Sequence, residues 1–143
     1  MCGIAGIFHL ETAKPVDPAR VQAMIDAMPH RGPDGTGVWT APGVGLGHCR
    51  LSTIDLAGGA QPMVNADGSL IITYNGEIYN FAEIRTELEA RGHRFRTHSD
   101  TEVILHAYRQ WGESCVERFN GMFAFALYEP ATQSLWLVRD RLG

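Results

Sequence analysis

The sequence lacks the features that mark two large classes of protein. It has no run of basic side chains, and its 12 Lys and Arg against 16 Asp and Glu give a formal net charge of −4. A chain without a basic stripe is a poor partner for the phosphate backbone of nucleic acids. No apolar stretch approaches the roughly 20 residues that a membrane-spanning helix needs. We therefore expect neither a nucleic-acid surface nor a membrane span.

Signals for export and for a metal site are missing as well. The N-terminus lacks the basic and apolar segments of a signal peptide, so we expect a cytoplasmic protein. Three cysteines at unrelated spacings form neither a disulfide framework nor a zinc site with paired ligands. The six histidines show no H-x-x-x-H or H-x-H spacing, so we expect no metal. Cys49 and Cys115 are expected to be small buried or half-buried thiols.

The length of 143 residues and the 45% of hydrophobic residues suit one domain with a substantial core. Its order of strands, helices and strands predicts an α+β domain with helices packed on sheets. In chain order the patterns predict a strand over 3–10, a helix with Val21, Met24, Ile25 and Met28 inward, strands over 37–40, 45–48, 51–55 and 70–74, helices from Asn80 to near Gly92, from Ser99 to Trp111 and over 113–120, and a hairpin of 122–128 with 134–139. Asn80 with Glu83, and Ser99 with Glu102, have the spacing of capping boxes.

Cys2 is the first candidate for chemistry. Methionine aminopeptidase removes Met1 readily when the next side chain is small, so the mature chain would begin with a cysteine. Thiols and α-amines titrate close together in model peptides, at about 8.5 and about 7.7–8.0. The amine can therefore take the proton of the thiol and return it to a leaving group. The alternative is that Cys2 is simply the second residue of an ordinary N-terminus.

Asn75-Gly76 follows the expected strand over 70–74 and can be interpreted in two ways. An asparagine amide and a glycine N–H, aimed at one point, are suitable donors for an oxyanion hole. Asn-Gly is also the strongest short signal for a type I′ hairpin turn. Without other context the turn is the favoured interpretation.

Two charged residues could hold a substrate. Arg50 could grip a carboxylate with its bidentate fork, although a surface arginine in a modest ion pair is the alternative. Asp100 could bind an ammonium group, although a plain N-cap is the alternative. Together they would hold the α-carboxylate and α-ammonium of an amino acid while a thiolate attacks its side-chain carbonyl. This combination points to acyl transfer from an amide such as glutamine.

Six motifs occur in order across the whole chain. They are Cys2-Gly3-Ile4-Ala5-Gly6, His30-Arg31-Gly32-Pro33-Asp34-Gly35, Gly47-His48-Cys49-Arg50-Leu51-Ser52, Asn75-Gly76-Glu77-Ile78-Tyr79-Asn80, Ser99-Asp100-Thr101-Glu102 and Arg139-Asp140-Arg141-Leu142-Gly143. Together they resemble the class II, N-terminal nucleophile, glutamine amidotransferase domain of glutamine-hydrolysing asparagine synthetases. The segments HRGPDG and RLS-x-ID favour this branch over amidophosphoribosyltransferase and glucosamine-6-phosphate synthase.

The resemblance implies an α+β fold of the N-terminal nucleophile hydrolase type, an αββα sandwich with two antiparallel sheets between helical layers. It also implies that Cys2 is the nucleophile and that Asn75 with the Gly76 N–H forms the oxyanion hole. The residues that it implies for glutamine binding are Arg50, Leu51, Ile54, Asn75, Gly76, Glu77 and Asp100.

The resemblance further implies a reaction and its partners. L-Glutamine would be hydrolysed to glutamate through a cysteinyl thioester, with no cofactor in this domain. The ammonia would pass to a C-terminal synthetase domain, where ATP and magnesium activate a carboxylate, usually that of aspartate. A homodimer is left open.

Two departures from the family pattern have consequences. Cys49 and Thr53 stand where relatives commonly carry other residues and could alter the pocket wall. The sequence stops at Gly143 without an ATP motif, so we expect a C-terminally truncated domain over 1–143 with a bare sheet edge and reduced stability. Two alternatives follow: an amidotransferase of a specialised pathway with another acceptor, and a catalytically silent glutamine-binding module.

Overall fold

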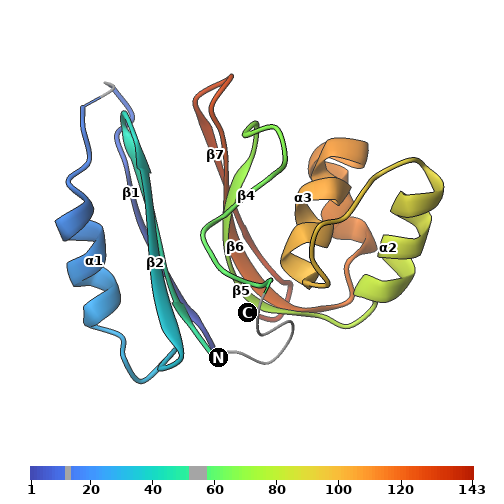
Figure 1. The fold of residues 1–143 in the computed structure, drawn as a ribbon, viewed down its shortest axis with the longest axis horizontal. Coiled ribbons are helices and arrows are strands. Elements are labelled where there is room, and N and C mark those ends of the chain that lie inside the picture. Colours follow the sequence, from blue (N-terminus) through green and yellow to red (C-terminus); the bar gives the residue numbers. More distant parts are fainter. Residues whose placement is uncertain (12–13, 52–57) are drawn as a thin grey trace.

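The chain folds into four layers, α, β, β and α (Figure 1). The structure is a computed structural model that describes residues 1–11, 14–51 and 58–143. Sheet A has the strand order β1 (Gly3–Phe8), β3 (Val44–Arg50), β2 (Gly35–Ala41). Sheet B has the order β4 (Met63–Val64), β5 (Ile71–Ile78), β6 (Gly121–Glu129), β7 (Ser134–Arg139). The helices are α1 (Pro18–Asp26), α2 (Phe81–Ala90), α3 (Asp100–Trp111) and the 3₁₀ helix η1 (Gly112–Arg118).

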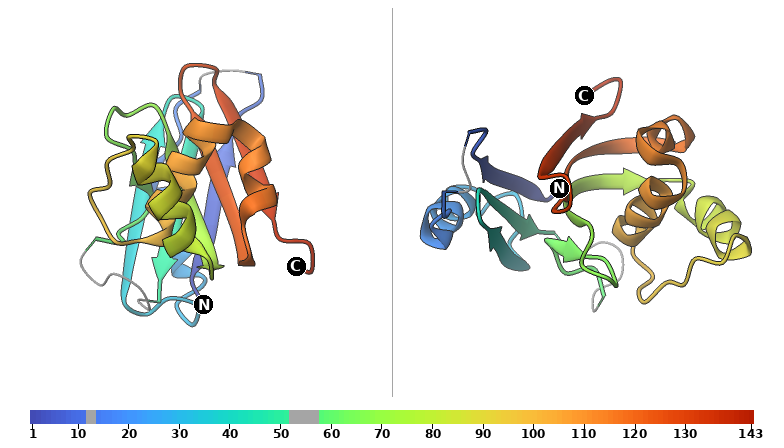
Figure 2. Two further views of the ribbon diagram at one scale, coloured as in Figure 1. Left: turned by 90° about the vertical axis from the view of Figure 1, so that its right-hand side faces the viewer. Right: turned by 90° about the horizontal axis from the view of Figure 1, so that it is seen from above.

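The view from above in Figure 2 shows the same order of layers. Helix α1 covers the outer face of sheet A, whereas α2, α3 and η1 cover the outer face of sheet B. Neighbouring strands within both sheets pair antiparallel. The α+β sandwich expected from the sequence is therefore present.

Two glycines on β3 let α1 lie close to sheet A. A Cβ atom at Gly47 would lie 2.8 Å from side-chain atoms of both Val21 and Ile25, and one at Gly45 would lie 2.8 Å from Val21. Val21 and Ile25 are fully buried and pack against these two glycines. Met24, expected on the same inner face, is 39% exposed, so that part of the predicted stripe is wrong.

Two apolar clusters hold the layers together. The larger lies between sheet B and its helices and includes Ile72, Leu88, Ile104 and Phe125. The smaller lies between the two sheets and includes Val44, Leu46, Ile71, Ala126 and Tyr128. Because side chains alternate along a strand, β5 supplies residues to both clusters. One face of β5 therefore packs against the helices and the other packs against sheet A.

Asn75-Gly76 lies inside β5 and is not a hairpin turn. Ladder pairing continues through Asn75 opposite Ala124 and Gly76 opposite Phe123. A Cβ atom at Gly76 would lie 2.6 Å from the Phe123 Cα, so the glycine permits a close approach of β6. Pairing with a distant strand has overridden the local turn preference.

Both predicted capping boxes are incomplete. The Asn80 side chain makes no capping hydrogen bond; its amide instead donates to the Arg118 carbonyl at 2.9 Å. Ser99 does cap α3, accepting from the Thr101 N–H at 3.1 Å. The Glu102 carboxylate does not return to Ser99 and accepts from the Thr97 N–H at 2.7 Å. The Glu102 carboxylate, which a complete capping box would pair with the Ser99 N–H, is therefore bound to the loop that contains Thr97.

Element boundaries differ from the predicted ones in several places. The strand expected over 3–10 ends at Phe8, and the helix expected over 113–120 is the 3₁₀ helix η1. The strands expected over 37–40 and 45–48 are longer and form the β2–β3 hairpin, and the hairpin of β6 and β7 is confirmed. Most of the strand expected over 51–55 lies outside the described residues.

Strand β7 forms one edge of sheet B. In the described part of the chain it pairs only with β6, and its Leu137 is 70% exposed. Strand β7 therefore leaves one of its edges without a partner strand among the described residues. No helix among the described residues is long and apolar enough to span a membrane.

Candidate active site

Cys2 is held rigidly at one end of sheet A, immediately before β1. Its Sγ accepts a hydrogen bond from the Leu51 N–H at 3.3 Å. The Arg31 Nε donates to the Cys2 carbonyl oxygen at 3.2 Å. Gly3, the next residue, pairs with Cys49 on β3. A terminus tied down by a strand and two hydrogen bonds does not fray, so this half-buried thiol has a defined position.

Sheet B brings three further candidates to Cys2. A hollow of about 200 Å³ is lined by Met1, Cys2, Leu51, Asn75, Gly76, Glu77 and Met122. Asn75 and Glu77 are two residues apart on β5 and so share one face of the strand. The Asn75 Oδ1 atom is buried and accepts no hydrogen bond from any described residue. A buried acceptor without a donor costs stability, and this one is open to a donor group of a ligand.

A second, smaller hollow also borders Cys2. It measures about 30 Å³ and is lined by Cys2, Arg50, Leu51, Gly59, Gln61, Tyr74, Gly76, Ser99, Asp100 and Thr101. Cys2, Leu51 and Gly76 border both hollows. Cys2 therefore shares one hollow with Arg50 and Asp100 and the other with Asn75 and Glu77.

Asp100 is the first residue of α3 and is only 5% exposed. Its Oδ2 accepts the Tyr74 hydroxyl at 2.6 Å and the Ile78 N–H at 3.2 Å. Burial raises the pKa of Asp100, and these two hydrogen bonds oppose that rise. A buried carboxylate of this kind is suited to a cationic ligand, because the charge of the ligand compensates for the lost hydration.

The structure gathers the sequence-predicted site residues that it describes. Cys2, Arg50, Leu51, Asn75, Gly76, Glu77 and Asp100 all border one of the two hollows. Ile54 and Thr53 lie outside the described residues. The smaller hollow has room for about one water molecule, so glutamine binding requires it to open. Loss of Met1 would enlarge the larger hollow, since Met1 is one of its walls.

Sequence reasoning missed Arg31, Gln61 and Tyr74, which support this site. Arg31 donates to the Cys2 carbonyl. It lies in the segment HRGPDG, whose turn residues do not indicate that contact. The Gln61 side chain accepts from the Tyr74 N–H at 2.6 Å and donates to the Thr101 hydroxyl at 3.3 Å. The partners are 13 and 40 residues from Gln61, so no local pattern could have indicated either contact.

Two buried hydrogen bonds join the sheets beneath the site. The His48 Nε2 on β3 donates to the Tyr74 carbonyl on β5 at 3.1 Å. The Thr73 hydroxyl on β5 donates to the Gly47 carbonyl on β3 at 3.0 Å. Sheet A carries Cys2 and Arg50, whereas sheet B carries Asn75 and Gly76. These bonds therefore help to fix the candidate nucleophile relative to the predicted oxyanion hole.

The buried His48 makes stability depend on pH. Burial lowers the pKa of His48 from 6.5 to about 4. Between these values the unfolded chain binds a proton that the folded chain does not, so the free energy of unfolding falls as the pH drops. The full loss is about 3 kcal/mol. We expect urea unfolding at pH 7 and pH 4.5 to show most of it.

His48→Gln is the matched control, because glutamine keeps an N–H for the Tyr74 carbonyl but does not titrate. It should flatten the pH dependence. Burial lowers the pKa of His106 and raises that of Asp100, and these two shifts contribute slopes of opposite sign that remain in both proteins. Equal slopes for His48→Gln and the parent would contradict this prediction.

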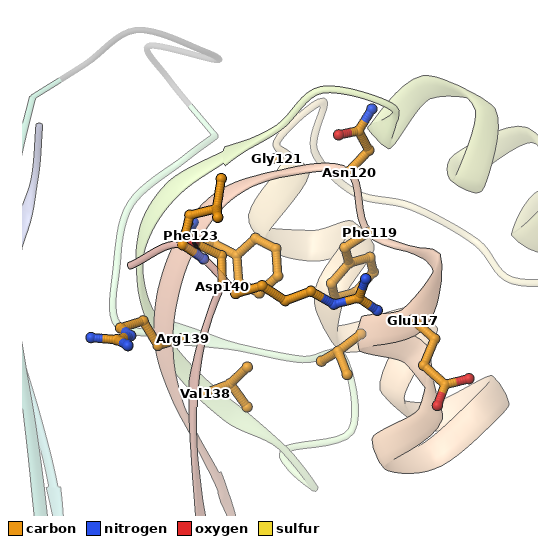
Figure 3. A pocket seen from close by; sticks show the side chains of 11 residues that line it. Glu117, Phe119, Asn120, Gly121, Phe123, Val138, Arg139 and Asp140 are labelled. Carbon is orange, nitrogen blue, oxygen red and sulfur yellow. Dashed lines mark hydrogen bonds between the residues drawn. The ribbon is translucent and has the colours of Figure 1, made fainter.

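The largest cavity recorded in the structure is elsewhere. It measures about 470 Å³ and lies where η1 and the start of β6 meet the end of β7. Figure 3 shows its lining, in which Phe119, Phe123 and Val138 are apolar and Arg139 and Asp140 are charged. It shares no lining residue with the two hollows at Cys2. Within the described ranges no group of three or more His, Cys, Asp or Glu could hold a metal ion.

Comparisons with known proteins identify the family of the chain. A family model described as glutamine amidotransferase domain matches residues 1–143. The chain is 43% identical over 145 residues to asparagine synthetase [glutamine-hydrolyzing] 3 of Bacillus subtilis, covering 100% of this chain and 24% of that protein. It is 41% identical over 143 residues to asparagine synthetase [glutamine-hydrolyzing] of Sandersonia aurantiaca, covering 100% of this chain and 27% of that protein. The chain thus spans about a quarter of the length of these relatives.

A solved structure supports the fold independently. Glutamine phosphoribosylpyrophosphate amidotransferase from B. subtilis superposes with a TM-score of 0.78 over 98% of this chain and 37% of that chain, at 20% sequence identity. At that identity the likeness concerns the fold alone. The family model matches every residue from 1 to 143, and so the chain belongs to the glutamine amidotransferase domain family.

Proposed function

We propose that this chain is the glutamine-hydrolysing part of an asparagine synthetase-like amidotransferase, with Cys2 as its nucleophile. One observation carries the proposal most. Cys2 borders both a hollow lined by Arg50 and Asp100 and a hollow lined by Asn75 and Glu77. The printed names of the relatives, which are glutamine-hydrolysing asparagine synthetases, support the same reaction.

Each group would have a distinct task. Arg50 would pair with the α-carboxylate and Asp100 with the α-ammonium of L-glutamine. Glu77 would contact the same substrate from β5, and Leu51 and Ile54 would line its path. Asn75 and the Gly76 N–H would donate to the oxygen of the attacked carbonyl.

The reaction would proceed in two steps. The thiolate of Cys2 adds to the δ-carbonyl carbon, and the α-amine of Cys2 holds the proton that the thiol lost. When the C–N bond breaks, that proton goes to the leaving nitrogen, which departs as ammonia. Water then cleaves the thioester, which releases glutamate and regenerates the thiol. Met1 must be removed first, because an amide nitrogen cannot take the proton.

The use of the ammonia would depend on a further domain outside residues 1–143. In the proposed protein a C-terminal synthetase domain uses ATP and magnesium to amidate aspartate in the cytoplasm, in a monomer or a homodimer. The relatives are about four times longer than this chain, which leaves room for such a domain. An acceptor other than aspartate would make the protein an amidotransferase of a specialised pathway.

A coupled assay tests the proposal. Incubation of the natural-length protein with L-glutamine should release glutamate and ammonia in equal amounts, whereas L-asparagine, one methylene shorter, should react far more slowly. Adding aspartate, ATP and magnesium should convert the ammonia to asparagine. Formation of glutamate without asparagine would support glutamine hydrolysis and would contradict aspartate as the acceptor.

A catalytically silent glutamine-binding module is the second candidate. A glutamine-like electrophile separates the two candidates. It should label Cys2 covalently in an enzyme. Glutamine binding without labelling and without ammonia release would select the silent module.

A further inference from the structure

Tyr74 makes three polar contacts beside the proposed catalytic groups. Its carbonyl accepts from His48, its N–H donates to Gln61, and its hydroxyl donates to Asp100. The side chain is only 2% exposed and lies in the cluster between sheet B and its helices. One residue on β5 thus connects sheet A, the segment that carries Gln61, and the start of α3.

The backbone of Tyr74 is fixed from both sides, which gives its hydroxyl a defined position. The Gln61 amide bridges the Tyr74 N–H and the Thr101 hydroxyl, so β5 and the first turn of α3 are joined a second time. The ring therefore has little freedom to follow Asp100 if that side chain moves. The 2.6 Å hydroxyl contact instead sets where the carboxylate stands.

Asp100 depends on these donors because it is buried. An ionised carboxylate loses hydration in the interior and keeps its charge only when hydrogen bonds replace the water. Tyr74 supplies a side-chain donor, and the N–H groups of Ile78, Asp100 and Thr101 supply backbone donors. Burial raises the pKa of Asp100, and the hydroxyl works against that rise.

We propose that Tyr74 is a positioning residue, which holds Asp100 ionised and oriented for the α-ammonium group of the substrate. This inference rests on the proposed function. It assigns the Tyr74 hydroxyl a role in selecting substrates that carry an α-ammonium group, and it gives Tyr74 no part in the bond-breaking step.

Tyr74→Phe in the natural-length protein is the direct test, because it removes one oxygen and leaves the ring. Hydrogen bonds to charged groups are strong, so the KM for glutamine should rise about tenfold or more while kcat changes less than about twofold. Loss of the donor raises the pKa of Asp100 further, so the acid limb of kcat/KM should move to higher pH. A merely structural role would not move that limb.

Tyr128→Phe is the matched control, since Tyr128 is a buried tyrosine on β6 that packs against Phe8 and Trp39. It should leave KM, kcat and the pH profile unchanged. If Tyr74→Phe does not fold, 3-fluorotyrosine at position 74 replaces it. That hydroxyl is a stronger donor, so the acid limb should move the opposite way, to lower pH.

The outcomes separate this inference from the proposed function. A parent protein that hydrolyses no glutamine would remove the proposed function and this inference together. Asp100→Asn with an unchanged KM would overturn the role of Asp100, and with it that of Tyr74. A raised KM in Asp100→Asn with unchanged KM and acid limb in Tyr74→Phe would overturn only this inference.

Discussion

Replacing Cys2 by alanine should reduce glutamine hydrolysis by about four orders of magnitude or more, because the nucleophile is lost. Cys2→Ser should behave almost as badly, since an alcohol is far less ionised than a thiol at neutral pH. Both side chains are small, so removal of Met1 should continue in both variants. Ammonia release from L-glutamine, measured on the natural-length protein, checks this expectation.

Cys115→Ala is the control for general effects of removing a thiol. Cys115 is fully buried in the cluster beneath sheet B and borders neither hollow at Cys2. It should retain activity at a small cost in stability. A chain that keeps Met1, identified by its intact mass, should be as inactive as Cys2→Ala. Normal activity with Met1 retained would rule out the α-amine as the base.

Asn75→Ala should lower kcat by about 10²–10³-fold, which is the usual cost of losing one oxyanion-hole donor. The KM for glutamine should change much less, because the donor acts on charge that develops only during the attack. The same substitution should not lower the free energy of unfolding. It removes a buried amide oxygen that accepts no hydrogen bond from any described residue.

Steady-state kinetics and thermal unfolding of one preparation test both halves of this prediction. Asn120→Ala, an exposed asparagine at the surface, should change neither quantity. A large fall in stability with Asn75→Ala would mean that the side chain is structural. An unchanged kcat would remove Asn75 from the oxyanion hole.

Local sequence patterns predict most helices and strands of the fold, but they do not predict the contacts between segments that are distant in the sequence. Helix α3 and the β6–β7 hairpin have long periodic segments, and the patterns place them within a residue or two of their positions. At Asn75-Gly76 the local propensity favours a turn. The strand conformation found there depends on Phe123 and Ala124, which are almost 50 residues away. Capping fails at Asn80 for a similar reason, since the side chain bonds to the Arg118 carbonyl.

The candidate site is predictable wherever a residue type implies chemistry. A thiol at position 2, an arginine and an aspartate together point to amide chemistry, although each has a simpler interpretation by itself. Only the resemblance to a family implied Leu51, Ile54 and Glu77 as substrate-binding residues. The supporting residues carry no such signature. Arg31, Gln61 and Tyr74 act through hydrogen bonds to partners that folding brings together. The sequence does not indicate the lowered pKa of His48 either, because that pKa depends on burial between the sheets.

Mass spectrometry of acid-quenched protein during glutamine turnover tests the central claim most directly. The N-terminal peptide should begin at Cys2, without Met1, and should carry one glutamyl group as a thioester that disappears when glutamine is exhausted. Steady ammonia release with an unmodified Cys2, or with the glutamyl group on Cys49 or Cys115, would contradict the account.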